Sequence, residues 1–275
     1  HCQKVGIEFS ASPFDCDSLS FLLEELGVTL IKIASGEITN PHLLVRAGES
    51  RAKVVLSTGM ASMGDIELAL MYLFWGRNHG GFPPSLRNGL QNLRHCLVSN
   101  EHQDWLTLLH CTTSYPAVFE ELNLGAIHTL RTAFRTNVGY SDHSLGTAAC
   151  VAAAALGASV IEKHFTLDRT APGPDHAASL EPIELMSMIK DIRRVEKALG
   201  SQIKLPTDSE IGNQEPARRS LVTVRAIAKG ESFTPDNIGT IRPDVGLSGN
   251  MLIHFLGKSA ERDFVSGELI EFGRA

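Results

Sequence analysis

The sequence lacks the features that mark several large classes of protein. Its 275 residues carry a net charge of −6 and contain no basic run interleaved with aromatic residues, which argues against nucleic-acid binding. Every apolar run falls short of the roughly 20 residues that span a membrane. The five cysteines are odd in number and form no CxxC pair, so we interpret them as the reduced thiols of a cytoplasmic protein.

The remaining composition is that of an ordinary globular protein, with 20% charged and 43% hydrophobic residues. A chain of this length can hold a substantial core and a small second domain. Residues 1–201 alternate short apolar runs with helical periodicity, and residues 202–216 are polar without periodicity. Residues 217–275 contain short β-like runs at 220–224, 238–241 and 252–256. We therefore expect an α/β domain, a linker and a small β-rich domain.

The first domain consists of six successive strand-helix units. The strands are expected at residues 5–10, 30–34, 54–57, 106–110, 138–141 and 160–163. Repeated βα units favour a TIM (β/α)8-type barrel, which closes with eight. Because the chain begins at His1 and enters the first run almost at once, we expect a barrel that is incomplete at its N-terminal end. An open six-stranded sheet that is complete as it stands is the alternative.

Two of these units place histidines at neighbouring strand ends. His143 follows the fifth strand, His164 follows the sixth, and an Ala-rich helix joins them. Parallel neighbours joined by a right-handed crossover lie side by side, so the two imidazoles should meet. Ser141 shares a strand face with His143, and Glu162 shares one with His164. The pair suits a first-row metal such as manganese, iron or zinc, although either histidine alone would more often be a hydrogen-bonded structural residue.

Other polar residues follow strands at the same edge. Lys32 and Ser35 end the second strand, Ser57 and Thr58 end the third, and Ser141 ends the fifth. An ammonium group and several hydroxyls on one rim suit a phosphate, although a single strand-end serine is usually a turn residue.

Carboxylates and a phenol lie on the same side, at Glu37, Tyr115, Glu162 and Asp175. These groups suit recognition of a polyhydroxy substrate and proton transfer. Helix capping is the alternative for Glu37 and Asp175.

The motifs that contain these residues resemble those of the sialic acid synthase family. They are SPFD (12–15), KIASGEITN (32–40), STGM (57–60), LLHCTTSYP (108–116), GYSDH (139–143), EKHFTLD (162–168) and GPDH (173–176). Residues 217–270 resemble the antifreeze-like SAF domain of that family. The form CTTSYP, with Thr113 where sialic acid synthases often carry Asn, is closer to the legionaminic acid branch.

The resemblance implies an activity, a cofactor and an assembly. The activity is condensation of phosphoenolpyruvate with N-acetylmannosamine or a related N-acetylated aldose to a nine-carbon 2-keto acid and phosphate. The cofactor is a divalent metal, Mn²⁺ ahead of Mg²⁺ or Co²⁺, held by His143 and His164 and acting as a Lewis acid on the sugar aldehyde. The assembly is a domain-swapped homodimer in which each SAF domain lies over the partner's barrel.

The resemblance also implies a role for each polar residue. It assigns phosphoenolpyruvate to Ser12, Lys32, Ser35, Ser57 and Ser141. It assigns the sugar to Glu37, Tyr115, Asp175 and, from the other subunit, Arg242. Glu162 would manage the water that attacks the oxocarbenium-like centre, and it forms the catalytic set together with His143 and His164.

The chain departs from the family pattern at its start. Family members open with a strand motif like EIGxNHxG and then a KFQ-like strand, and neither motif is present here. Both observations lead us to expect an incomplete catalytic ring and an impaired chain. A metal-dependent aldolase or hydrolase on a similar barrel, and a non-catalytic sugar-binding protein, remain as alternative functions.

Overall fold

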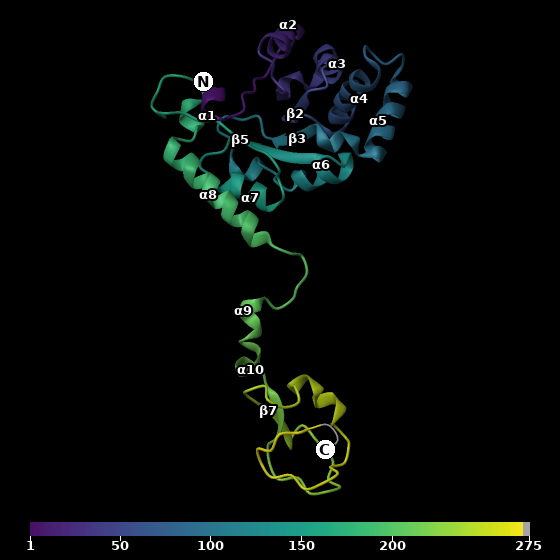
Figure 1. Cartoon of the computed structure of the whole chain (residues 1–275), viewed down its shortest axis with the longest axis vertical. Helices are drawn as coiled ribbons and strands as arrows, with labels where there is room; N and C mark the ends of the chain where they lie inside the picture. Colours follow the sequence, from purple (N-terminus) through teal and green to yellow (C-terminus); the bar gives the residue numbers. More distant parts are fainter. Residues whose placement is uncertain (272–275) are drawn as a thin grey trace. The chain divides into compact units, whose positions relative to one another are not determined.

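The structure of the chain is a computed structural model that describes residues 1–271. The chain forms two compact units, His1–Gly200 and Ser201–Ala275, which are described separately (Figure 1). Within the described residues, the helices are too short or too polar to cross a membrane.

The first unit contains one parallel sheet with the strand order β1-β2-β3-β4-β5. Its strands are β1 (Leu30–Ile33), β2 (Lys53–Ser57), β3 (Leu106–Cys111), β4 (Asn137–Asp142) and β5 (Ile161–Lys163). Between them lie α3 (Pro41–Glu49), α4 (Met63–His79), α5 (Leu86–Ser99), α6 (Ala126–Phe134) and α7 (Ala148–Ala155), and α8 (Pro182–Leu199) follows β5. Short helices precede the sheet at α1 (Cys2–Val5), α2 (Cys16–Ser20) and a π-helix over Phe21–Glu25. Four 3-10 helices complete the unit, at Ser35–Thr39, Glu101–Asp104, Phe119–Glu121 and His176–Ala178.

Capping side chains stabilise the first turns of α3 and α4, which follow β1 and β2. The side chain of Asn40 accepts a hydrogen bond from the amide of Leu43, and Pro41 occupies the first turn of α3. Ser62 and Asp65 form a reciprocal capping box at the start of α4. The chain reversals after β1 and β2 therefore have their own polar stabilisation, whereas α6 and α7 begin without a side-chain cap hydrogen bond.

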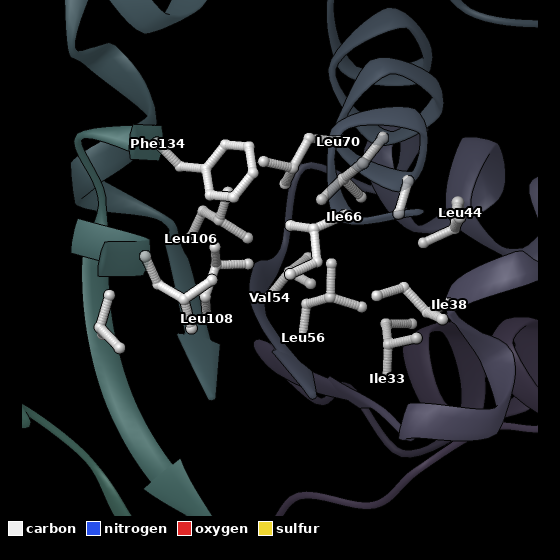
Figure 2. Packing of buried hydrophobic residues seen from close by; sticks show 14 of the residues in the cluster. Ile33, Ile38, Leu44, Val54, Leu56, Ile66, Leu70, Leu106, Leu108 and Phe134 are labelled. Carbon is white, nitrogen blue, oxygen red and sulfur yellow. The ribbon is translucent and has the colours of Figure 1, made fainter. Parts of the chain in front are cut away.

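The sheet buries its outer face against the helices. Successive residues of a strand point to opposite faces of the sheet, and residues paired in the parallel register share a face. Every second residue of each strand therefore contributes to one apolar row on the outer face. Figure 2 shows Val54, Leu56 and Leu106 of this row packing toward Ile66 and Leu70 of α4. This layer is the core of the first unit, and burying it turns the alternate residues of each strand to the inner face.

A cross-sheet contact shows that the sheet curls into a half-barrel. Four inter-strand steps of about 4.8 Å would separate β1 and β5 by about 19 Å in a flat sheet. However, Lys32 Nζ of β1 lies 3.2 Å from Glu162 Oε1 of β5, although these strands are the two edges. The side chains can meet only across a concave inner face. The structure therefore confirms the expected barrel-type α/β architecture.

The first expected strand is wrong, so the sheet has five strands and not six. Residues 2–5 are helical and residues 7–14 are irregular. The segment makes only scattered contacts with β1, such as the hydrogen bond from Ser10 Oγ to the Leu30 carbonyl. Its alternating apolar side chains Val5, Ile7 and Phe9 are exposed. The pattern of a strand is present, but the described residues supply no apolar surface to bury it.

The second unit has its own small core. Helices α9 (Asp208–Ile211) and α10 (Gln214–Ala217) occupy the segment expected as a linker, and β6 (Ser220–Thr223) pairs antiparallel with β7 (Ile238–Ile241). The core contains Leu221, Phe233, Phe255 and Phe264. The strand expected at residues 252–256 is wrong, because Gly249–His254 form a 3-10 helix that directs Phe255 inward.

The packing of α3 against α4 yields a stability prediction. A Cβ on Gly76 would lie 2.3 Å from the Val45 carbonyl oxygen of α3, whereas a Cβ on Gly64 of the same helix would meet nothing closer than 3.8 Å. We expect Gly76→Ala to lower the free energy of unfolding by about 1–3 kcal/mol through overpacking. The control Gly64→Ala should raise it by up to about 1 kcal/mol through helix propensity. Urea denaturation measures both, and equal effects would contradict the close helix contact.

Candidate active site

The inner face of the curled sheet is polar near the carboxyl ends of its strands. Cys111, Ser141 and Glu162 lie in register on β3, β4 and β5, so they share this face. Lys32 of β1 and Ser57 of β2 lie on it by the same alternation. Four of the residues predicted from the sequence, Lys32, Ser57, Ser141 and Glu162, are therefore brought together by the fold.

Glu162 is the centre of this group. Its Oε1 accepts a hydrogen bond of 2.7 Å from Ser141 Oγ and lies 3.2 Å from Lys32 Nζ. Ser141 is buried, whereas the side chains of Lys32 and Glu162 are 23% and 37% exposed. The ammonium group and the hydroxyl are thus oriented toward a place that solvent can reach, and a bound anion could take over their hydrogen bonds.

The hydroxyls predicted for a phosphate group differ in their partners. Ser57 is 1% exposed, and its Oγ has no hydrogen-bond partner among the described residues. Thr58 Oγ1 instead donates to the Leu109 carbonyl, and Ser35 Oγ accepts from the amide of Gly59. A buried hydroxyl without a partner costs about 1–3 kcal/mol, so Ser57 marks a position where a ligand oxygen would be stabilising.

The two histidines lie side by side, as the strand-helix-strand pattern predicts. Their ring centroids are 5.4 Å apart at 49°. His143 Nδ1 lies 2.8 Å from the Thr112 carbonyl oxygen. Because a carbonyl only accepts, Nδ1 carries the proton and Nε2 keeps a free lone pair. Burial lowers the pKa of His143, and the neighbouring His164 acts in the same direction, so the ring is neutral at pH 7.

This donor set fits a divalent metal with open positions. A neutral imidazole whose second nitrogen is held by a carbonyl is the usual state of a metal-ligating histidine. Asp175 Oδ2 is 4.0 Å from His164 Nδ1, and residues 1–271 contain no group of three or more His, Cys, Asp or Glu side chains that could hold a metal ion. His143 and His164 would therefore supply two ligands and leave the others to water or substrate.

Tyr115 lies beside the histidine pair. Its ring centroid is 4.1 Å from that of His143 and 5.8 Å from that of His164. Burial raises the pKa of Tyr115, and Cys111 and Asp175 add to this rise, so the phenol keeps its proton and can donate. Tyr115 and Asp175 thus lie beside the histidines, which follow β4 and β5. Lys32 and Ser57 lie on β1 and β2, toward the other edge of the sheet.

The remaining predicted residues lie around this centre or in the other unit. Glu37 Oε2 accepts from Asn40 Nδ2, and Asn40 caps α3, so the alternative that Glu37 caps this helix is wrong. The Asp175 side chain likewise makes no cap hydrogen bond. Ser12 is half-buried in the irregular segment beside β1. Arg242 is exposed and belongs to the second unit.

The sequence analysis missed a buried ion pair behind the histidines. Lys163 Nζ is 2.7 Å from Asp142 Oδ2, and their side chains are 2% and 0% exposed. Burial would raise the pKa of Asp142, but hydrogen bonds from Lys163 and Ser144 hold it below its ordinary value. The signal was available, because the residues that precede the two histidines carry opposite charges and should face one another on the outer side of β4 and β5.

Comparison with known proteins identifies the family of both parts of the chain. Residues 1–204 match the NeuB family, and residues 218–274 match the SAF domain. The chain is 45% identical, over 98% of its length, to the N,N'-diacetyllegionaminic acid synthase of Campylobacter jejuni, of which it covers 74%. The corresponding synthase of Legionella pneumophila is 36% identical over 96% of the chain and is covered to 68%.

A solved structure is also similar. It is the N-acetylneuraminic acid (sialic acid) synthetase of Leptospira borgpetersenii in complex with citrate, which is 37% identical and has a TM-score of 0.63. The match covers 77% of this chain and 65% of that chain. Together with the sequence motifs and the curled parallel sheet, these matches show that the chain belongs to the NeuB family and carries a C-terminal SAF domain.

Proposed function

We propose that the chain is a nonulosonic acid synthase, which condenses phosphoenolpyruvate with an N-acetylated aldose of the N-acetylmannosamine type. The products are a nine-carbon 2-keto acid and phosphate. The observation that carries this proposal is the convergence of Lys32 and Ser141 on Glu162 along the inner face that also bears Ser57 and leads to the histidine pair. The names of the relatives support the same class of product.

Phosphoenolpyruvate has two anionic groups, and the inner face offers matching donors. Lys32 supplies the positive charge, and the hydroxyls of Ser57 and Ser141 supply hydrogen bonds. Ser57 Oγ has no hydrogen-bond partner within residues 1–271, so a phosphate or carboxylate oxygen would satisfy it without breaking any hydrogen bond described there. Ser35 and Ser12, near the same strand ends, complete the proposed anion site.

The sugar is proposed to lie on the histidine side. His143 and His164 would hold the divalent metal, Mn²⁺ ahead of Mg²⁺ or Co²⁺, which when bound polarises the sugar aldehyde. We assign the sugar hydroxyls to Tyr115 and Asp175, which lie beside the histidines, and to Glu37, which lies in the 3-10 helix after β1. In the homodimer that we propose, Arg242 of the second unit reaches the sugar in the other subunit.

Glu162 is proposed to act on water. The enol carbon of phosphoenolpyruvate attacks the aldehyde carbon, the aldehyde C=O π bond breaks, and the adjacent carbon becomes oxocarbenium-like. The aldehyde oxygen becomes a hydroxyl by taking up one proton, which the water proton accepted by Glu162 balances. Water adds to that carbon while Glu162 accepts its proton, and collapse of the adduct releases phosphate. Lys32 Nζ lies 3.2 Å from this carboxylate, so the anion site and the carboxylate that would act on water are neighbours.

The sugar itself is proposed to be the substrate of the legionaminic acid branch. Thr113 distinguishes the motif, and its Oγ1 would lie 2.2 Å from a Cβ on Gly59, so this hydroxyl packs directly on the turn after β2. A competition between N-acetylated and N,N'-diacetylated aldoses tests this choice. Preference for the mono-acetylated sugar would place the chain in the sialic acid branch.

Affinity for phosphoenolpyruvate should depend on Lys32. Loss of a charged hydrogen bond costs about 1.5–3 kcal/mol, so Lys32→Met should weaken phosphoenolpyruvate binding by roughly 10- to 100-fold. The control Lys53→Met removes an exposed lysine at the opposite, amino end of β2 and should leave the affinity unchanged. Isothermal titration calorimetry measures both variants. Equal affinities in the two variants would contradict the proposed anion site.

Turnover should require the metal and both histidines. In a protein that starts at the verified start codon of its gene, supplied with phosphoenolpyruvate, an N-acetylated aldose and Mn²⁺, we expect keto-sugar acid and phosphate in equal amounts, and no product after chelation. His164→Ala should lower product formation at least about 100-fold, because even the loss of a group that only orients a metal ligand costs about 10- to 100-fold in metal affinity or activity. His128→Ala, on the exposed face of α6, should not.

Two other outcomes would replace the proposal. Turnover of the sugar without phosphoenolpyruvate and without phosphate release would indicate an aldolase or hydrolase. Calorimetric binding of the sugar without turnover, in a protein that starts at the verified start codon of its gene, would indicate a non-catalytic sugar-binding protein.

A further inference from the structure

The ion pair between Asp142 and Lys163 lies directly behind the two histidines. Tyr140, Ile161, Asp142 and Lys163 face the helices, and Ser141 and Glu162 face the inner side. The pair Asp142 and Lys163 is the last pair in the β4 and β5 ladder. The next residue of each strand is a histidine, so this contact is the final cross-strand link before the imidazoles.

Lys163 holds the backbone on both sides of His143. Its Nζ donates to the carboxylate of Asp142 and also to the main-chain carbonyl of Ser144. The amide of Ser144 donates back to Asp142 Oδ1. The side chain of the residue before His164 therefore bonds to both residues that flank His143, and so links the chain positions that carry the two histidines.

Both oxygens of the Asp142 carboxylate accept hydrogen bonds. Its Oδ1 accepts from Tyr140 OH, Ser144 N and Ser144 Oγ, and its Oδ2 accepts from Cys150 Sγ and Lys163 Nζ. Of these donors, only Lys163 comes from β5. The others belong to β4, the turn after it, or α7, so they shape one strand end without linking it to the next.

Fold stability alone gives no reason for a charged pair at this place. A buried ion pair contributes little net stability compared with well-packed apolar side chains, because desolvation offsets the attraction. β5 is short, with only three residues in the ladder. A directional link at its end therefore does what apolar packing cannot, which is to specify where the next side chain sits.

We propose that Lys163, acting through Asp142 and Ser144, is a positioning residue that sets the separation of the His143 and His164 imidazoles. It touches neither substrate nor metal. The inference rests on the proposed function, because its consequence is a metal affinity that depends on both rings binding one ion at once.

The test is Co²⁺ binding by the full 275-residue chain, followed by visible absorption. In Lys163→Met the cross-strand link is lost, so Co²⁺ should bind at least about tenfold more weakly, with a visible spectrum that differs from that of the unaltered chain. The matched control is Tyr140→Phe, which removes a buried donor from the same carboxylate but leaves the contact between β4 and β5. Its Co²⁺ affinity should stay within twofold of that of the unaltered chain.

The outcomes separate positioning from stability. Both variants are compared by thermal unfolding, and Lys163→Gln, which is shorter but keeps a donor, replaces Lys163→Met if that variant does not fold. Unchanged Co²⁺ affinity and spectrum in the folded lysine variant would overturn the proposal, whatever its unfolding temperature. If the unaltered chain binds no Co²⁺, the metal assignment in the proposed function fails.

A crystal structure of the lysine variant then tests the positioning role of Lys163. An unchanged separation of 5.4 Å between the ring centroids of His143 and His164 would overturn that role.

Discussion

The curl of the parallel sheet is the constraint on which the rest of the first unit depends. Helices α3 to α7 bury the apolar row on the outer face, which turns the alternate residues inward. Curling then brings the inner side chains of the edge strands within reach of one another, as the contact between Lys32 and Glu162 shows. Without curvature these residues would lie on opposite edges of a flat surface and could not form one site.

The polar groups on the two faces of the sheet differ in how completely they are hydrogen-bonded. On the outer face, Asp142 accepts hydrogen bonds from several donors and is completely buried. On the inner face, Ser57 is buried and has no hydrogen-bond partner in the described part of the chain, and the partly exposed Lys32 and Glu162 pair with one another. A buried polar group that lacks a hydrogen-bond partner is costly. We therefore interpret the fully hydrogen-bonded Asp142 network as structural, and the unsatisfied hydroxyl of Ser57 as a position for a ligand.

Local patterns predicted most of the sheet and its helices because apolar period and capping residues act over a few positions. The motif order also predicted the family, and adjacent strand ends predicted the meeting of His143 and His164. The prediction failed where a local pattern needed a distant partner. Residues 5–10 have the alternation of a strand but remain irregular and exposed, and the apolar run at 252–256 begins in a 3-10 helix.

By itself, the sequence determined, to within about a residue, where the five strands of the sheet end and which residues near those ends share a face, because both follow from the period of two and from chain order. Only the tertiary structure decided that Lys32 meets Glu162 across the curl, that Ser57 finds no hydrogen-bond partner among the residues described, and that Lys163 bonds to both residues that flank His143. These contacts depend on curvature and on register between strands far apart in the chain. Such long-range geometry leaves no periodic trace in the order of the amino acids.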